Sequence, residues 1–106
     1  RLMDAAKRRR VESQGWKVGN VQELFKLSDE QTAFIEIKAR LAVALAKLRS
    51  RQQLTQVEVA RKLGSSQSRL AKMESADKTV SLDLLVRSLL TLGATCKEVA
   101  AAIAGK

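Results

Sequence analysis

The stretch TQVEVARKLGSSQSRLAKME, residues 55–74, decides the fold of this chain. Thr55 and Glu58 have the spacing of a capping box, in which each side chain bonds the backbone N–H of the other residue. A helix is therefore predicted to begin at Gln56. Gly64 follows the last apolar residue of this helix, where a left-handed residue commonly ends a helix. The pattern predicts a short helix followed by a sharp turn.

A second short helix is predicted directly after this turn, with Ser65 or Ser66 as its N-cap. Leu70 and Met73 fall on its inner side at helical spacing. Where the two helices cross, a small residue is needed, and Ala60 supplies it. The outer side of the second helix carries no carboxylate, and its residues are Gln67, Ser68, Ala71 and Lys72.

The outer side has the chemistry that the major groove of DNA accepts. A glutamine amide can pair bidentately with adenine, a lysine can reach guanine, a serine serves several bases, and an alanine can contact the thymine methyl group. We therefore interpret Gln67, Ser68, Ala71 and Lys72 as base-reading residues. Arg69, on the flank, suits a phosphate, and so does Gln56 at the start of the preceding helix.

At this point the residues carry a family resemblance. The run TQxxxAxxLG, continued by SQSRLxKxE, resembles the Cro/repressor-like helix-turn-helix family, also called the XRE family, over about residues 41–92. The resemblance implies a five-helix, lambda-repressor-like domain in which Gln67, Ser68 and Lys72 read bases and Gln56 holds the sugar-phosphate backbone of the DNA. It also implies that Lys78 contacts the DNA backbone. Ser65 departs from the pattern, because many members carry an aliphatic residue there, and Ser75-Ala76 replaces the usual Asn-Gly.

Composition narrows the class of protein. The chain has 106 residues, no Pro, no His, one Cys and a formal net charge of +9, which favours an all-α protein with a polyanionic partner. No metal-ligand spacing, Gly-rich phosphate loop or carboxylate pair among apolar residues is present, so we expect neither an enzyme nor a cofactor. A single cysteine and the lack of an apolar run of membrane-span length predict a cytoplasmic protein without a membrane partner.

Two domains are predicted, residues 1–27 and 28–106. The first combines a basic arm with a short apolar extension, which contains Trp16, Phe25 and a helix at about 21–26. This extension either folds back on the rest of the chain or anchors another protein. The second domain holds the helix-turn-helix and three further helices, predicted at about 29–50, from Ser81 to about 92, and after Thr95.

The long helix at 29–50 has two apolar sides. Its core stripe is predicted to include Phe34, and its other side carries small residues, among them Ala39 and Ala42, that would meet a second partner. In the fourth helix, Leu84 and Leu90 fall outside the side that is predicted to be buried. Together with the alanine-rich last helix, they form a candidate homodimer surface.

Two main readings of function follow. The leading one is a DNA-binding transcriptional regulator, a repressor that acts as a dimer on double-stranded DNA. The second is an antitoxin, since a short aromatic-bearing extension joined by a long helix to this type of domain is similar to HigA-type antitoxins, which bind a ribonuclease toxin and repress their own operon. The alternative is that residues 55–74 form two ordinary amphipathic helices whose polar faces contact only solvent. Structured RNA is disfavoured because aromatic stacking platforms are lacking.

Overall fold

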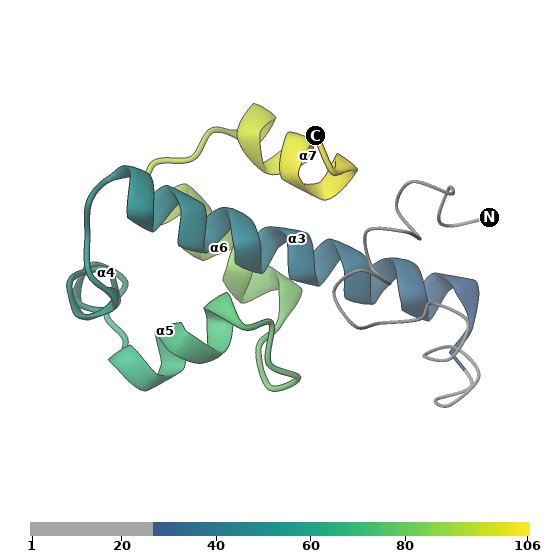
Figure 1. Ribbon diagram of the computed structural model, residues 1–106, viewed down its shortest axis with the longest axis horizontal. Coiled ribbons are helices and arrows are strands. Elements are labelled where there is room, and N and C mark those ends of the chain that lie inside the picture. The colour runs from purple at the N-terminus through teal and green to yellow at the C-terminus, as the bar shows by residue number, and fades with distance from the viewer. Residues whose placement is uncertain (1–26) are drawn as a thin grey trace. The chain divides into compact units, whose positions relative to one another are not determined.

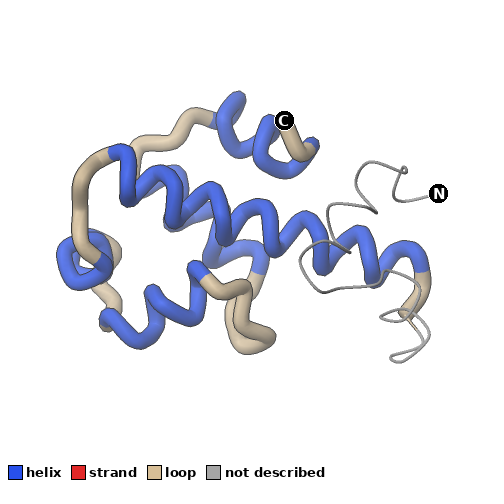
Figure 2. The backbone as a smooth tube through the Cα atoms, in the orientation of Figure 1, coloured by secondary structure: helices blue, strands red, loops and turns tan. Residues whose placement is uncertain are grey.

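A computed structural model of the chain describes residues 27–106 (Figure 1). Throughout this part the backbone forms α-helices joined by loops, without a strand (Figure 2). The predicted all-α fold is thereby confirmed, while the predicted helix at 21–26 lies outside the described residues. The helices are α3 Asp29–Arg51, α4 Gln56–Lys62, α5 Gln67–Glu74, α6 Leu82–Thr91 and α7 Cys96–Ala104.

The chain divides into two units, Arg1–Glu36 and Ile37–Lys106, and the boundary between them falls within α3. In the second unit, α4 packs against α5 and α6 packs against α7. The predicted boundary between two domains, after residue 27, stays a prediction.

Each helix begins at a polar N-cap, as the sequence predicts. Thr55 and Thr95 form complete capping boxes with Glu58 and Glu98. Ser28 does the same for α3 with Gln31, whose backbone N–H donates to Ser28 Oγ at 3.1 Å. Ser66 and Ser81 cap α5 and α6. A cap of this kind typically stabilises a helix by about 1 kcal/mol, which matters for helices as short as α4 and α5.

The helices also end alike. After each one, the residue in the left-handed region donates its backbone N–H to the carbonyl of the residue three positions earlier. The next residue donates to the carbonyl five positions before itself, which completes the Schellman arrangement. Glycine holds the left-handed position after α4, α6 and α7, as at Gly64 with φ 65°. Gln53 and Ala76 hold it after α3 and α5, with φ 59° and 56°. The turn at Ser75-Ala76 is therefore closed in the usual way, although it lacks glycine.

The core lies among the helices of the second unit. Its largest fully buried side chains are Leu41, Leu45, Val59, Leu70, Met73 and Leu85. Ala60 is only 3% exposed, as expected for the small residue at the crossing of α4 and α5. The prediction that Phe34 continues the core stripe of α3 is wrong, because Phe34 is 50% exposed. It precedes the unit that contains this core.

Candidate nucleic-acid interface

The turn between α4 and α5 is built from local hydrogen bonds. Beyond the end of α4, Gly64 N–H donates to Arg61 O at 3.1 Å and Ser65 N–H donates to Ala60 O at 2.8 Å. Ser66 then caps α5, with its Oγ accepting from Arg69 N–H at 3.2 Å. These bonds occupy carbonyls and N–H groups that would otherwise lack partners at the two helix ends. The chain thus changes direction within a few residues, and α5 packs against α4.

The outer face of α5 is exposed to solvent. Leu70 and Met73 are 0% and 1% exposed, so they fix which way the helix faces. The predicted base-reading residues are all exposed, and they are Gln67, Ser68, Ala71 and Lys72. Within residues 27–106, no hydrogen bond or ion pair engages the side chain of Gln67 or Lys72. Their polar ends remain available to a ligand.

The residues predicted to contact phosphates differ in exposure. Arg69 and Lys78 are exposed. Arg69 also lines a hollow beside α5, whose other lining residues are Ser66, Ser68, Lys72, Thr79 and Val80. Hydroxyl groups and cationic side chains from α5 and the following loop therefore border one space. Gln56 is half-buried and has a partner within the domain.

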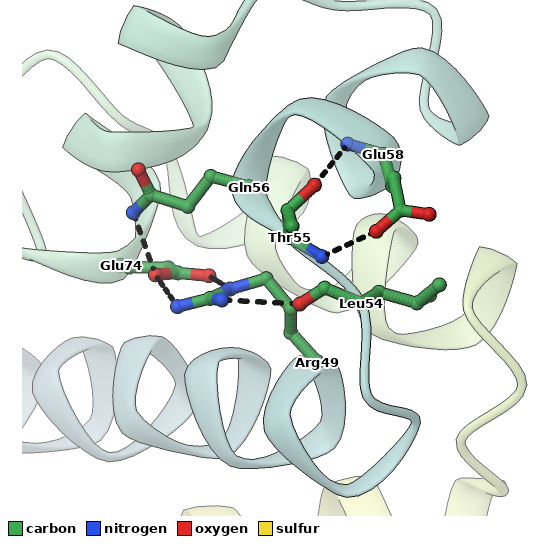
Figure 3. Close-up of polar contacts among 6 residues, drawn as sticks. All are labelled: Arg49, Leu54, Thr55, Gln56, Glu58 and Glu74. Atoms are coloured by element: carbon green, nitrogen blue, oxygen red, sulfur yellow. Dashed lines mark hydrogen bonds and ion pairs between the residues drawn. The ribbon is translucent and has the colours of Figure 1, made fainter.

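That partner is Glu74, the last residue of α5. Glu74 Oε1 accepts from Gln56 Nε2 at 3.0 Å, while Arg49 donates to both carboxylate oxygens, at 2.6 and 3.0 Å (Figure 3). Arg49 Nη1 also donates to the carbonyl of Leu54 at 3.2 Å. One carboxylate thus connects the end of α3, the start of α4 and the end of α5.

Burial by itself would raise the pKa of Glu74. The hydrogen bonds from Arg49 and Gln56, together with the positive charge of Arg49, outweigh it and hold the pKa below its ordinary value of 4.5. The Glu74 side chain is 9% exposed and that of Arg49 is 23% exposed. Sequence reasoning missed this network, because its members are distant in the chain and their types are common. The only signal was a glutamate just inside the end of α5.

Ser65 occupies an unusual environment in the same turn. Its Oγ is buried and has no hydrogen-bond partner among the described residues. A buried hydroxyl without a partner costs free energy, because its hydrogen bonds with water are lost and not replaced. This is the position at which the sequence departs from the expected aliphatic residue. We therefore expect serine to stabilise the turn less than an aliphatic residue would at this position.

The residues predicted for a partner or dimer interface are scattered. Ala39 is exposed, Leu84 is half-buried and Leu90 is 42% exposed. Ala42 is only 2% exposed, so the prediction that it lies on an interaction surface is wrong. It belongs to the hydrophobic core cluster of the second unit. Trp16 and Phe25 are outside the described residues.

Among residues 27–106, no group of three or more His, Cys, Asp or Glu side chains is placed to hold a metal ion. None of the helices in this part of the chain combines the length and the apolarity that crossing a membrane requires.

A short helix that ends at a left-handed glycine, followed by a second helix with an exposed polar face, defines the helix-turn-helix class of DNA-binding domains. Residues 24–99 match the family model described as a helix-turn-helix domain, and the chain belongs to this family. No curated protein and no solved structure matches it.

Proposed function

We propose that the protein is a sequence-specific transcriptional regulator of the Cro/repressor-like type, and that it represses by binding an operator. The observation that carries this proposal is the outer face of α5, which exposes Gln67 and Lys72 without a hydrogen bond or ion pair to the described residues and has no carboxylate among residues 67–72. A formal net charge of +9 adds a general attraction to DNA.

In the proposed complex, α5 lies in the major groove. Gln67 and Lys72 hydrogen-bond base edges, Ser68 contributes a further hydrogen bond, and Ala71 contacts a thymine methyl group. Arg69 and Lys78 contact phosphates beside the groove, and these contacts set the register of the helix without carrying sequence information.

Gln56 is the proposed anchor on the backbone on the other side of the turn. Its Nε2 bond to Glu74 uses one of the two amide hydrogens, so the second hydrogen remains for a phosphate oxygen. The carboxylate behind the amide is itself paired with Arg49, which limits its repulsion of the DNA.

The proposed functional unit is a homodimer on a palindromic site. Two copies of α5 would occupy successive major grooves about 34 Å apart, which is one turn of B-DNA. Leu90, a large apolar side chain that is 42% exposed, and the half-buried Leu84 on the same helix are the proposed contacts between protomers.

Selection from a pool of random duplexes tests the proposal directly. The full chain is expected to enrich one palindromic sequence, with half-sites about 10 base pairs apart. Its affinity for that duplex is expected to exceed the affinity for an unselected duplex by at least about a thousandfold at physiological salt. Equal affinity for selected and unselected duplexes would exclude a sequence-specific regulator.

A second candidate function is that of an antitoxin, which would bind and neutralise a ribonuclease toxin and repress its own operon. The observation that favours it is the exposure of two neighbouring apolar side chains in the first part of α3, Phe34 at 50% and Ile35 at 52%. Exposed apolar groups of this size commonly mark protein–protein contacts. The order of extension, long helix and helix-turn-helix domain is the other support.

Co-expression with the protein encoded next to this one tests that candidate. An antitoxin is expected to rescue growth from a toxic neighbour and to co-purify with it, whereas the double variant Phe34→Ser/Ile35→Ser is expected to lose the complex. The paired control, Val57→Ser, changes an exposed apolar residue on α4 and should keep it. A neighbour that is harmless and does not co-purify would leave only the regulator.

A further inference from the structure

Asp77 lies immediately beyond the C-terminal end of α5 and is held there by several bonds. Its backbone N–H donates to the carbonyl of Lys72 at 3.0 Å, which places it next to the last turn of the helix. Its Oδ1 accepts from the backbone N–H of Thr79 at 2.9 Å and from the Thr79 hydroxyl at 2.6 Å. The carboxylate is therefore fixed relative to the outer face of α5.

The carboxylate is ionised at neutral pH. The hydrogen bonds from the hydroxyl and backbone N–H of Thr79 hold the pKa of Asp77 below its ordinary value of 3.8, and the positive charges of Lys72 and Lys38 lower the pKa further. Lys72 belongs to the proposed base-reading residues, so a fixed negative charge acts directly on one of them.

Asp77 is linked to the hollow beside α5 through Thr79, from which it accepts two hydrogen bonds. Its hydrogen-bond partner Thr79 lines the hollow beside α5 together with Lys72 and Arg69. A phosphate approaching this hollow is attracted by the two cationic groups and repelled by the carboxylate behind Thr79. An acidic residue at this position would weaken DNA binding in a protein whose affinity came from its overall positive charge alone.

We propose that Asp77 is a selectivity residue, which weakens binding to DNA of arbitrary sequence more than it weakens binding to the operator. The proposal rests on the function proposed above. Non-specific affinity comes almost entirely from phosphates neutralised by Lys and Arg, and a fixed carboxylate beside Lys72 reduces that term. Specific affinity includes base contacts in addition, and these hold the phosphates in one register that avoids the carboxylate.

The test uses two duplexes of equal length, the one selected by the wild-type chain from a random pool and an unselected one. In Asp77→Asn the side-chain oxygen remains to accept from Thr79, so only the charge is removed. We expect the affinity for the unselected duplex to rise about threefold per protomer. The affinity for the selected duplex should rise by less, so that the ratio of the two falls.

Asp83→Asn is the matched control, because it removes the same charge from an exposed site on α6, 3.5 Å from Arg87. It should leave the ratio of affinities unchanged. Asp77→Ser is a second variant in case the amide distorts the loop, since a serine hydroxyl can still accept from the Thr79 N–H. A thermal melt confirms that each variant is folded.

Two results would overturn the proposal. If Asp77→Asn and Asp83→Asn raise the affinity for both duplexes equally, the effect is one of net charge alone. If Asp77→Asn weakens only the selected duplex and relaxes one base pair, the carboxylate accepts a hydrogen bond from a base instead. A wild-type chain that selects no sequence contradicts the proposed function, which is a different and separately visible outcome.

Discussion

Arg49 and Glu74 form a two-point ion pair between the C-terminal ends of α3 and α5, with Nε 2.6 Å from Oε2 and Nη2 3.0 Å from Oε1. The side chains are 23% and 9% exposed, so both charges are largely removed from water. In such a pair, the loss of one partner leaves the other charge desolvated and uncompensated.

Glu74→Gln is therefore expected to lower the free energy of unfolding by about 2 kcal/mol, which chemical denaturation measures. Asp83→Asn is the control, because the Arg87–Asp83 pair is 77% and 75% exposed and spans 3.5 Å. It should change the free energy by less than about 0.5 kcal/mol. Equal effects of the two substitutions would show that the buried pair contributes no more than a surface pair.

The same pair predicts how stability depends on pH. The pKa of Glu74 is lower in the folded chain than its ordinary value of 4.5, so the folded state loses its proton more readily than the unfolded state does. The resulting stabilisation is fully present above 4.5 and is lost as the pH falls through the folded pKa. Unfolding measured from about pH 6 to pH 3 should show a shallower loss of stability in Glu74→Gln than in the wild type. A parallel pH dependence would contradict this.

The adjacent serines of the turn are expected to respond in opposite directions. Ser65→Ala removes a buried hydroxyl that has no partner and should raise the free energy of unfolding by about 1 kcal/mol. Ser66→Ala removes the N-cap of α5 and should lower it by about 1 kcal/mol. The comparison is internally controlled, because both changes remove one hydroxyl from the same turn. Two changes of the same sign would contradict the assignment.

The left-handed helix ends allow a second matched comparison. Gln53 is exposed and has φ 59°, so Gln53→Gly should raise the free energy of unfolding by about 0.5 to 1 kcal/mol. Gly64→Ala should lower it by about 1 to 2 kcal/mol. A Cβ at Gly64 meets nothing within 4 Å, so this cost is conformational and not steric. Thermal denaturation of both variants measures the effects, and an unchanged Gly64→Ala protein would show that the turn relaxes.

The outer face of α5 is predicted to determine which DNA sequence is bound. Gln67→Ala and Lys72→Ala are each expected to reduce discrimination at one base pair per half-site by about 1 to 3 kcal/mol. Arg69→Ala should weaken binding to all DNA sequences alike. It should also make the salt dependence of the affinity shallower, by the equivalent of about one phosphate contact. Competition binding against duplexes with single base changes separates the two behaviours. If Lys72→Ala leaves both the affinity and the base preference unchanged, Lys72 is not a base-reading residue.

Local signals predicted the helices well because the bonds that begin and end them span only a few residues. The capping pairs Thr55–Glu58 and Thr95–Glu98 are recognisable in the sequence, and both form. The exposure of Gln67 and Lys72 follows in the same way from the inward positions of Leu70 and Met73.

Features that depend on tertiary packing were not predictable in this way. The spacing of Ala42 could not show that it would be buried in the core, and the periodicity that included Phe34 in the core stripe does not show where the core ends. The network at Glu74 likewise requires knowing that three helix ends meet. The left-handed Gln53 was also missed, because glutamine gives no signal for this conformation.

The carboxylate of Glu74 has one consequence for how the proposed complex would respond to strain. Gln56 donates to Oε1 of this carboxylate and Arg49 donates to both of its oxygen atoms, so a displacement of Gln56 by the DNA strand would pass to the last turn of α5 through hydrogen bonds of 3.0 Å or less. The backbone anchor and the base-reading helix would then shift together as one rigid lever. A kink in the DNA at the anchor would be felt at the bases, even where the protein touches none of the intervening nucleotides.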